Sequence, residues 1–301
     1  MTKWKTDKTR GLVTGVGLMI TIILVDSGLI ALAADQSAVS IGAFVIGLAA
    51  MSSLGLLALI GYWLYGLARS GYTLDRNALV IRWGDTEHTI PSDQIERVLT
   101  GDEVEGRIRM HSGGAWPGHY VGVGELPGAG PTIFYATVPP KSQIYVVTPK
   151  ITYGISPANR EVFLESLRER WEMGPTQAIE QSYTRPGFMD WAIWRDKLGL
   201  SLLGMGFLTI LALVGLLCFQ FPNLPMLVPL HFGAAGTPDR LGSRGQVFTI
   251  PLIGFLVLLL NLSLGTLAYR RERTLSYLLW GGAILVQALT WVAALGILGY
   301  S

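Results

Sequence analysis

Five long apolar blocks constrain this chain more than any other feature of its sequence. None contains Lys or Arg, and they are Leu12–Ala33, Ile41–Leu67, Leu198–Phe219, Phe248–Tyr269 and Tyr277–Gly299. A helix rises 1.5 Å per residue, so about 20 residues cross a hydrocarbon core of roughly 30 Å. Only 15% of the 301 residues are charged, and nearly all of these lie between the blocks. The pattern predicts an α-helical integral membrane protein with about five spans.

The positions of the basic residues predict the orientation of these spans. Lys and Arg lie before the first block, between the second and third, and between the fourth and fifth: Lys3, Lys5, Lys8, Arg10, Arg69, Arg185, Arg195, Lys197, Arg270, Arg271 and Arg273. Short loops rich in Lys and Arg stay in the cytoplasm. We therefore expect a multi-pass protein of the plasma membrane, with its N-terminus in the cytoplasm and its C-terminus outside.

An alternative concerns the first block. Ala31-Leu32-Ala33 resembles the small-residue site at which signal peptides are cleaved. The block is longer than a usual signal core, and a second apolar block follows closely, so we favour a retained span. Cleavage would leave the rest of the topology unchanged.

A region of short strands separates the second and third blocks. Alternating apolar residues and turn residues predict strands at Tyr72–Leu74, Leu79–Trp83, Glu87–Ile90, Thr132–Thr137, Gln143–Thr148 and Thr152–Ile155. The Gly- and Pro-rich stretch Gly113–Gly130 is expected to form a long, ordered loop with one strand inside it. We assign residues 71–174 to a cytoplasmic, mostly β domain.

A helix is predicted at the end of this domain. Ser156 is a favourable N-cap residue and Pro157 suits a first helical turn. Phe163, Leu167 and Trp171 recur every four residues and form one apolar stripe. The order of elements predicts a partly open β-barrel that this helix caps.

The domain also resembles a known family. The segments that carry the resemblance, in order, are Tyr72-x-Leu74, Ile90-Pro91, Trp116-Pro117-Gly118, Gly128-x-Gly130, Phe134-Tyr135-Ala136-Thr137, Tyr153-x-Ile155-Ser156-Pro157 and Phe163. They are similar to the pleckstrin-homology-like (PH-like) domains of bacterial membrane proteins. The resemblance implies a scaffold for protein binding or self-association, without catalytic apparatus.

The charges of the domain argue against phosphoinositide binding. In familiar pleckstrin-homology domains a cluster of Lys and Arg near the first hairpin holds the phosphates. Here Arg76 and Arg82 stand beside Asp75, Asp85 and Glu87, and residues 72–171 hold ten Lys and Arg against twelve Asp and Glu. A slightly acidic surface gains little from anionic headgroups.

The linker of residues 175–197 carries aromatic residues just before the third block. Phe188, Met189, Trp191 and Trp194 stand among polar residues, and Trp prefers the headgroup level of a membrane. We expect a short interfacial helix here, with a plain linker as the alternative.

The loop of residues 220–247 carries the most unusual sequence of the three-span region, residues 198–301. It contains Pro229-x-His231-Phe232-x-x-x-Gly236-x-Pro238-Asp239-Arg240, and Pro251 follows. This segment resembles a domain of unknown function in bacterial membrane proteins that also occurs in SdpI-type toxin-immunity and signalling proteins. We do not find counterparts of the remaining SdpI-type spans in the sequence.

Three interpretations of this outer loop remain open. His231 and Asp239 could bond to each other, and Arg240 could pair with a carboxylate, with Gly236 permitting a tight turn. We favour a structural knot that joins the ends of the third and fourth spans. A binding site for an external ligand comes second. A metal or catalytic site is least favoured, because one His and one Asp supply too few ligands.

Three polar residues lie inside the blocks. Asp26 stands in the first, Asn261 in the fourth and Gln287 in the fifth. They could form a small polar site or proton relay. We favour hydrogen bonds that hold the helices together.

Together these patterns predict a non-enzymatic membrane scaffold or signalling protein, bound to the lipid bilayer and to a protein partner or a second copy. No nucleic-acid, cofactor or metal site is expected. The alternatives are a toxin-immunity or stress-response protein that senses a ligand through the outer loop, and a small-solute transporter or membrane enzyme. The three would differ in what mild cross-linking captures.

Overall fold

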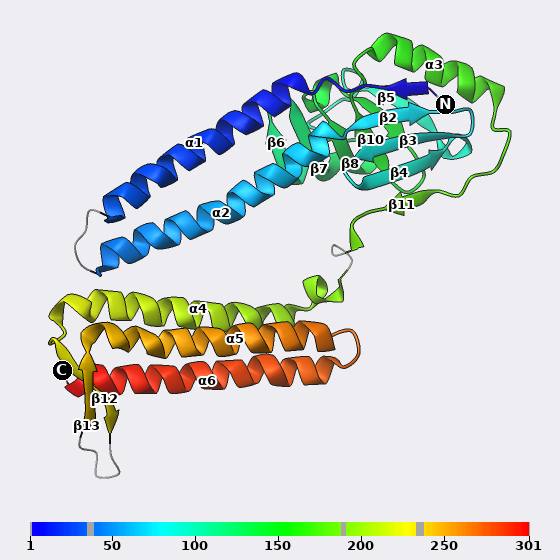
Figure 1. Cartoon of the computed structure of the whole chain (residues 1–301). Helices are drawn as coiled ribbons and strands as arrows, with labels where there is room; N and C mark the ends of the chain where they lie inside the picture. Colours follow the sequence, from blue (N-terminus) through cyan, green and yellow to red (C-terminus); the bar gives the residue numbers. More distant parts are fainter. Residues whose placement is uncertain (1, 35–38, 188–190, 233–237, 301) are drawn as a thin grey trace. The chain divides into compact units, whose positions relative to one another are not determined.

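The computed structural model describes residues 2–34, 39–187, 191–232 and 238–300 (Figure 1). By its internal contacts the chain divides into two compact units, Met1–Asp26 with Ser53–Gly187 and Ser27–Ser52 with Phe188–Ser301. The first unit holds the β domain and the adjoining ends of two helices. The second unit contains the three remaining long helices and the outer loop.

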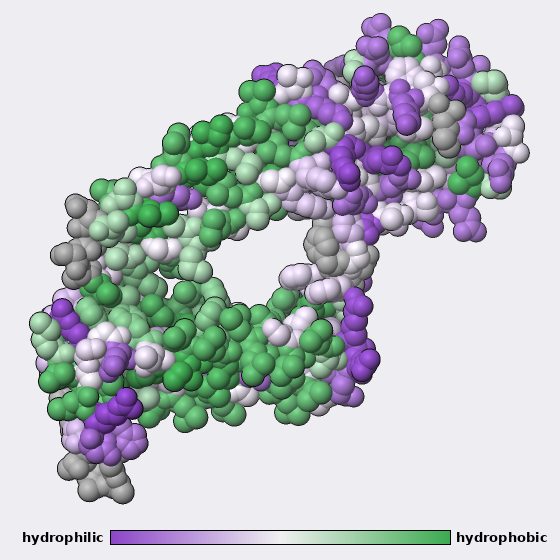
Figure 2. Space-filling model, in the orientation of Figure 1, coloured by the Kyte–Doolittle hydropathy of each residue, from purple (hydrophilic) through white to green (hydrophobic). Residues whose placement is uncertain are grey.

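Five helices in the described residues are long and apolar enough to cross a membrane. They are α1 (Thr9–Ala34), α2 (Ile41–Ala68), α4 (Lys197–Gln220), α5 (Thr249–Ala268) and α6 (Arg273–Tyr300). On the face that Figure 2 shows, hydrophobic residues predominate over the helices and hydrophilic residues are concentrated on the β domain. The expectation of a multi-pass membrane protein with a mostly β insertion is confirmed.

The β domain consists of two sheets whose residues share one large buried apolar cluster. The first sheet has the order β1-β2-β3-β4-β11 and the second the order β5-β9-β10-β8-β7-β6. Their strands are β1 (Thr2–Trp4), β2 (Gly71–Leu74), β3 (Ala78–Trp83), β4 (Thr86–Pro91), β5 (Arg97–Thr100), β6 (Arg109–Trp116), β7 (His119–Leu126), β8 (Gly130–Ala136), β9 (Ile144–Val147), β10 (Thr152–Ile155) and β11 (Ser182–Thr184). The sheets do not close into a barrel, so the predicted barrel is an open pair of sheets.

The stretch expected to be a long loop is instead mostly the hairpin β6–β7. Its strands pair from Arg109 with Glu125 to Trp116 with His119. Glycines obscured it in the sequence, because they are poor strand formers. Here they let the strands approach: a Cβ on Gly122 would lie 1.9 Å from the carbonyl oxygen of Ser112.

The helix α3 (Arg160–Met173) caps the core as expected, but it begins later than predicted. Phe163 and Leu167 are buried, whereas Trp171 is 40% exposed. Ser156 does not cap the helix, since its hydroxyl accepts a hydrogen bond from the backbone N–H of Thr137 at 2.7 Å. The prediction was therefore wrong for Ser156 and for Trp171.

Segments outside the predicted domain cover both edges of the first sheet. Strand β1 pairs with β2, and Trp4 meets Phe163 edge to face with 5.3 Å between ring centroids. At the other edge β11 pairs with β4, and Tyr183 stacks on the buried His88 at 4.3 Å. The first residues and part of the linker thus belong to the domain.

Only part of the expected interfacial helix lies among the described residues. Phe188 and Met189 lie outside the described residues, and Ala192–Arg195 forms a single 3-10 turn. After this turn Asp196 caps α4 by accepting from the backbone N–H of Gly199 at 3.0 Å. The hydroxyls of Tyr269 and Tyr277 also donate to Asp196, at 2.7 and 2.6 Å. These bonds, chiefly the one from Gly199, lower the Asp196 pKa to about 2.

Helices α4, α5 and α6 pack together as a three-helix bundle (Figure 1). Trp291 of α6 donates its indole N–H to the carbonyl oxygen of Thr209 in α4 at 3.1 Å. At the end of α4 the outer loop forms a hairpin of β12 (Leu227–Phe232) and β13 (Pro238–Ser243). The base of this hairpin joins an apolar cluster that includes Leu213, Leu217, Phe221, Leu224, Val228, Val247, Ala294 and Ile297.

The capping helix generates the first prediction. Phe163→Ala in the full-length protein should destabilise the β domain by about 3–5 kcal/mol, because it empties a fully buried ring site. Native-state hydrogen exchange of β2 and β10 measures this loss. Trp171→Ala, at a partly exposed position of the same helix, is the control and should cost far less. Equal losses in the two variants would contradict the packing described here.

Candidate functional site

A close contact joins the β domain to the first two membrane helices. The turn between β6 and β7 lies against α1: a Cβ on Gly118 would lie 2.1 Å from the backbone nitrogen of Gly11. Gly118 has φ +90°, a conformation that favours glycine. The indole N–H of Trp116 donates to the Gly11 carbonyl oxygen at 3.2 Å. Backbone therefore meets backbone here, with no room for a side chain.

Aromatic rings fill the same contact from the side of α2. His119 stacks on Trp116 with 4.0 Å between centroids, and Trp63 and Trp83 each lie 6.0 Å from the His119 ring. Trp63 also packs over Gly114, and Leu67 at the end of α2 is part of the core of the β domain. We call Gly11, Trp63, Trp83, Trp116, Gly118 and His119 the helix–domain junction.

His119 is the unusual member of the junction. Its side chain is fully buried, and neither ring nitrogen has a hydrogen-bond partner among the described residues. Burial among tryptophans lowers the His119 pKa to about 4, because the charged ring has no compensation there. Desolvation also lowers the pKa of His88 in β4 to about 4, although its Nε2 lies 3.0 Å from the Tyr135 hydroxyl. Both rings are neutral near pH 7.

Polar bonds add to the junction where the helices leave the domain. The Lys8 ammonium donates to the carbonyl oxygen of Ala68 at 2.7 Å, and the hydroxyls of Thr6 and Ser70 lie 2.7 Å apart. The two segments that flank the membrane hairpin are thus bonded to each other as well as to the sheets. Sequence reasoning missed this site because its residues are far apart in the chain.

The outer loop brings together two of its predicted residues. His231 Nδ1 and Asp239 Oδ1 lie 2.6 Å apart across the hairpin, with the side chains 68% and 51% exposed. Arg240 is exposed on β13 opposite His231. Gly236 lies outside the described residues. The hairpin is therefore buried at its base and exposed where it carries this pair.

The intramembrane polar residues do not form one cluster. Asp26 of α1 accepts from the Ser53 hydroxyl of α2 at 2.5 Å. The Asn261 amide donates to the carbonyl oxygen of Val257 in its own helix at 2.9 Å. The Gln287 amide donates to the Gly254 carbonyl oxygen at 2.8 Å and so joins α6 to α5. The bonds of Asp26 and Gln287 each join two helices, as helix packing requires, whereas the Asn261 bond stays within α5.

The described residues contain no group of three or more His, Cys, Asp or Glu that could hold a metal ion.

Two protein families match parts of the chain. Residues 70–171 match the bacterial PH domain. This region is therefore PH-like, and we refer to it below as the PH domain. Residues 207–255, which span most of α4, the outer hairpin and the start of α5, match a domain of unknown function, DUF1648. Both resemblances expected from the sequence are confirmed.

A relative matches a short part of the chain. An uncharacterized protein of Archaeoglobus fulgidus is 48% identical over 33 residues, which cover 11% of this chain and 18% of that protein. The match spans less than a fifth of that relative. No solved structure matches the chain.

The buried histidines generate a pH prediction. Their folded pKa of about 4 lies below the ordinary histidine pKa of 6.5. The unfolded PH domain therefore binds more protons between these values, and stability is complete above pH 6.5 and falls as the pH drops toward 4. The slope is at most about 1.4 kcal/mol per pH unit for each ring. Hydrogen exchange of the PH domain against pH measures it, and His119→Phe should flatten the curve. An unchanged slope in this variant would show that His119 does not titrate as described.

The outer hairpin generates another prediction. Asp239→Asn should change stability by less than about 1 kcal/mol, because exposed ion pairs contribute little. Leu224→Ala, at the buried base of the same loop, should cost about 2–5 kcal/mol. Melting of both variants in detergent tests the contrast. If Asp239→Asn destabilises as much as Leu224→Ala, the pair is the structural knot that the sequence favoured.

Proposed function

We propose that this protein is a non-enzymatic membrane scaffold that presents its PH domain to a protein partner or a second copy at the cytoplasmic face of the plasma membrane. The helix–domain junction carries the proposal. A domain on a flexible linker samples many orientations, whereas this junction ties the PH domain to α1 and α2. A partner would then meet the same surface of the domain at a constant angle to the bilayer.

Contacts from the membrane helices into the core of the PH domain support a signalling role. Leu67 of α2 is fully buried in the core of the PH domain, and Leu12 of α1 packs against that core. A rearrangement of the two membrane helices would therefore disturb the domain directly. The buried packing of the junction would transmit the change, since packed interiors deform little before they switch arrangement.

The strand β6 offers the partner a place to bind. It is the outermost strand of the second sheet, and no described strand pairs with its outer edge. Such an edge can accept a strand from another chain by backbone hydrogen bonds. His111 on this strand is exposed. We assign this edge to a second copy of the chain, because antiparallel pairing of two β6 strands sets Arg109 against Trp116 and brings no like charges together.

A second candidate function is ligand sensing by the outer loop, as in a toxin-immunity or stress-response protein. The exposed His231–Asp239 pair and the nearby Arg240 favour it, because they could exchange their present contacts for those of a ligand. Within the described residues, no contact of Asp26, Asn261 or Gln287 favours the transporter or membrane-enzyme alternative.

The scaffold is tested by photo-cross-linking of the full-length protein in its native membrane. A photoreactive residue in place of His111 should give a discrete dimer adduct. Gly118→Ala should greatly reduce this adduct, because a methyl group there collides with α1 and loosens the junction. If the protein with an unmodified junction gives only monomer and no adduct, the proposal is contradicted.

Gly128→Ala is the matched control. Gly128 also has a positive φ, +73°, but a Cβ there would meet nothing within 4 Å. Both variants carry the cost of about 1–2 kcal/mol for a side chain in this conformation, and only Gly118→Ala adds the collision. Equal loss of the adduct in both variants would trace it to domain stability and count against the junction.

A further inference from the structure

A cavity of about 670 Å³ opens beside the end of α2. It is lined by Arg69, Arg82, Gly84, Asp85, Thr86, Glu87 and Thr184. These residues come from the end of the membrane helix, from the β3–β4 hairpin and from the edge strand β11. The cavity belongs to none of the contacts of the helix–domain junction described above.

The cavity lies at the level of the lipid headgroups. Helix α2 has 28 residues, and at 1.5 Å per residue it is longer than a hydrocarbon core of roughly 30 Å. Tyr62, Trp63 and Tyr65 occupy its last turns and Arg69 follows it directly. Such aromatic and basic residues mark the membrane–water interface. The turn at Gly84 touches α2, since a Cβ on Gly84 would lie 3.1 Å from Gly66 Cα.

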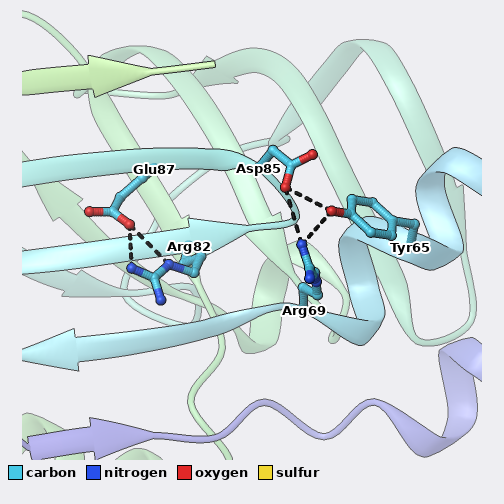
Figure 3. A network of polar contacts seen from close by, with 5 residues as sticks. All are labelled: Tyr65, Arg69, Arg82, Asp85 and Glu87. Atoms are coloured by element: carbon cyan, nitrogen blue, oxygen red, sulfur yellow. Dashed lines mark hydrogen bonds and ion pairs between the residues drawn. The ribbon is translucent and has the colours of Figure 1, made fainter. Parts of the chain in front are cut away.

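Side chains of both charges line this cavity, and Figure 3 shows the contacts between them. Arg69 lies 3.3 Å from Asp85, and the Tyr65 hydroxyl donates to the same carboxylate oxygen at 2.7 Å. Across the hairpin, Arg82 donates to one oxygen of Glu87 from Nε, at 2.9 Å, and from Nη2, at 2.5 Å. The two positive and two negative charges of these side chains sum to zero.

Each of the four groups retains bonding capacity. Among the described residues, Arg69 bonds through Nη1 and Asp85 through Oδ1. Arg82 bonds there through Nε and Nη2, and Glu87 accepts at Oε2. The second oxygen of Asp85 points away from Arg69 (Figure 3). All four side chains are more than one-third exposed. Exposed ion pairs contribute little to stability, so a ligand can share these groups at small cost.

We propose that this cavity binds a phosphate group linked to an ammonium group, as in the headgroup of phosphatidylethanolamine. The phosphate binds Arg69 and Arg82, which match phosphate oxygens well. The ammonium binds Asp85 and Glu87. A purely anionic headgroup meets two carboxylates and is disfavoured. The acyl chains of a bound lipid lie along the exposed face of α2, which carries Leu59 and Tyr62.

This site is distinct from the turn at Asp75–Asn77, whose few basic residues argued against phosphoinositides. Strand β3 begins beside that turn and ends beside Gly84. The two places therefore lie at opposite ends of one strand.

The test uses full-length protein in mild detergent, mixed with equal amounts of phosphatidylethanolamine and phosphatidylglycerol that share the same acyl chains. Native mass spectrometry should show preferential retention of phosphatidylethanolamine. Arg82→Gln and Glu87→Gln should each reduce it about tenfold, the loss expected for one charge-assisted bond. Arg107→Gln, at an exposed arginine of the same domain, is the matched control and should not. Melting curves verify that each variant is folded.

The outcomes separate the possibilities. If phosphatidylglycerol is preferred, or if both variants retain phosphatidylethanolamine as the unmodified protein does, the proposal is overturned. If Glu87→Gln strengthens retention of both lipids, the site recognises phosphate alone and the ammonium assignment is wrong. Soluble phosphoethanolamine is then added as a competitor. Displacement of the lipid at comparable concentrations supports the same chemistry and assigns a soluble source, whereas no displacement assigns the bilayer lipid.

Discussion

Hydrocarbon offers no hydrogen-bond partner to backbone or side chain, and this constraint organises the whole protein. The five apolar helices satisfy their own backbones. Their few polar side chains bond within one helix, as Asn261 does in α5, or to a neighbouring helix, as Gln287 does. Most groups that carry charge or need water therefore lie at the helix ends. The helix–domain junction, the charged cavity beside α2, the Asp196 cap and the outer hairpin all lie there.

Much of the fold could be predicted from the sequence because its signals are local. Each apolar block corresponds to one helix, and Thr152–Ile155 has the strand bounds that its pattern predicted. The predictions that failed concern elements that depend on tertiary contacts. Strands β6 and β7 contain glycines that are needed only because a neighbouring backbone passes close by. Strand β1 is three residues long, and it exists because β2 offers a free edge.

The same distinction separates the candidate sites. The His231–Asp239 contact could be anticipated, since a separation of eight positions with glycines between the two residues suits a hairpin. The junction could not, because Trp63 and His119 meet only once the sheets are formed. A signal was nevertheless present: Trp116-Pro117-Gly118 combines a large ring with a residue that tolerates positive φ. Such a combination indicates a turn that packs against another part of the chain.

The end of the PH domain that meets the membrane is set by the direction of β3. Because α2 leads into β2, the turn at Asp75–Asn77 lies a full strand away from the bilayer and β3 returns the chain to it. The turn at Gly84–Asp85 must then reach the headgroups, and the charges of Arg69, Arg82, Asp85 and Glu87 collect beside it. The surface charges of a soluble PH domain decide which of its ends faces a membrane. In this protein covalent connection and the packing of Gly118 on Gly11 make that choice, which leaves the charges beside Gly84 available to select among headgroups.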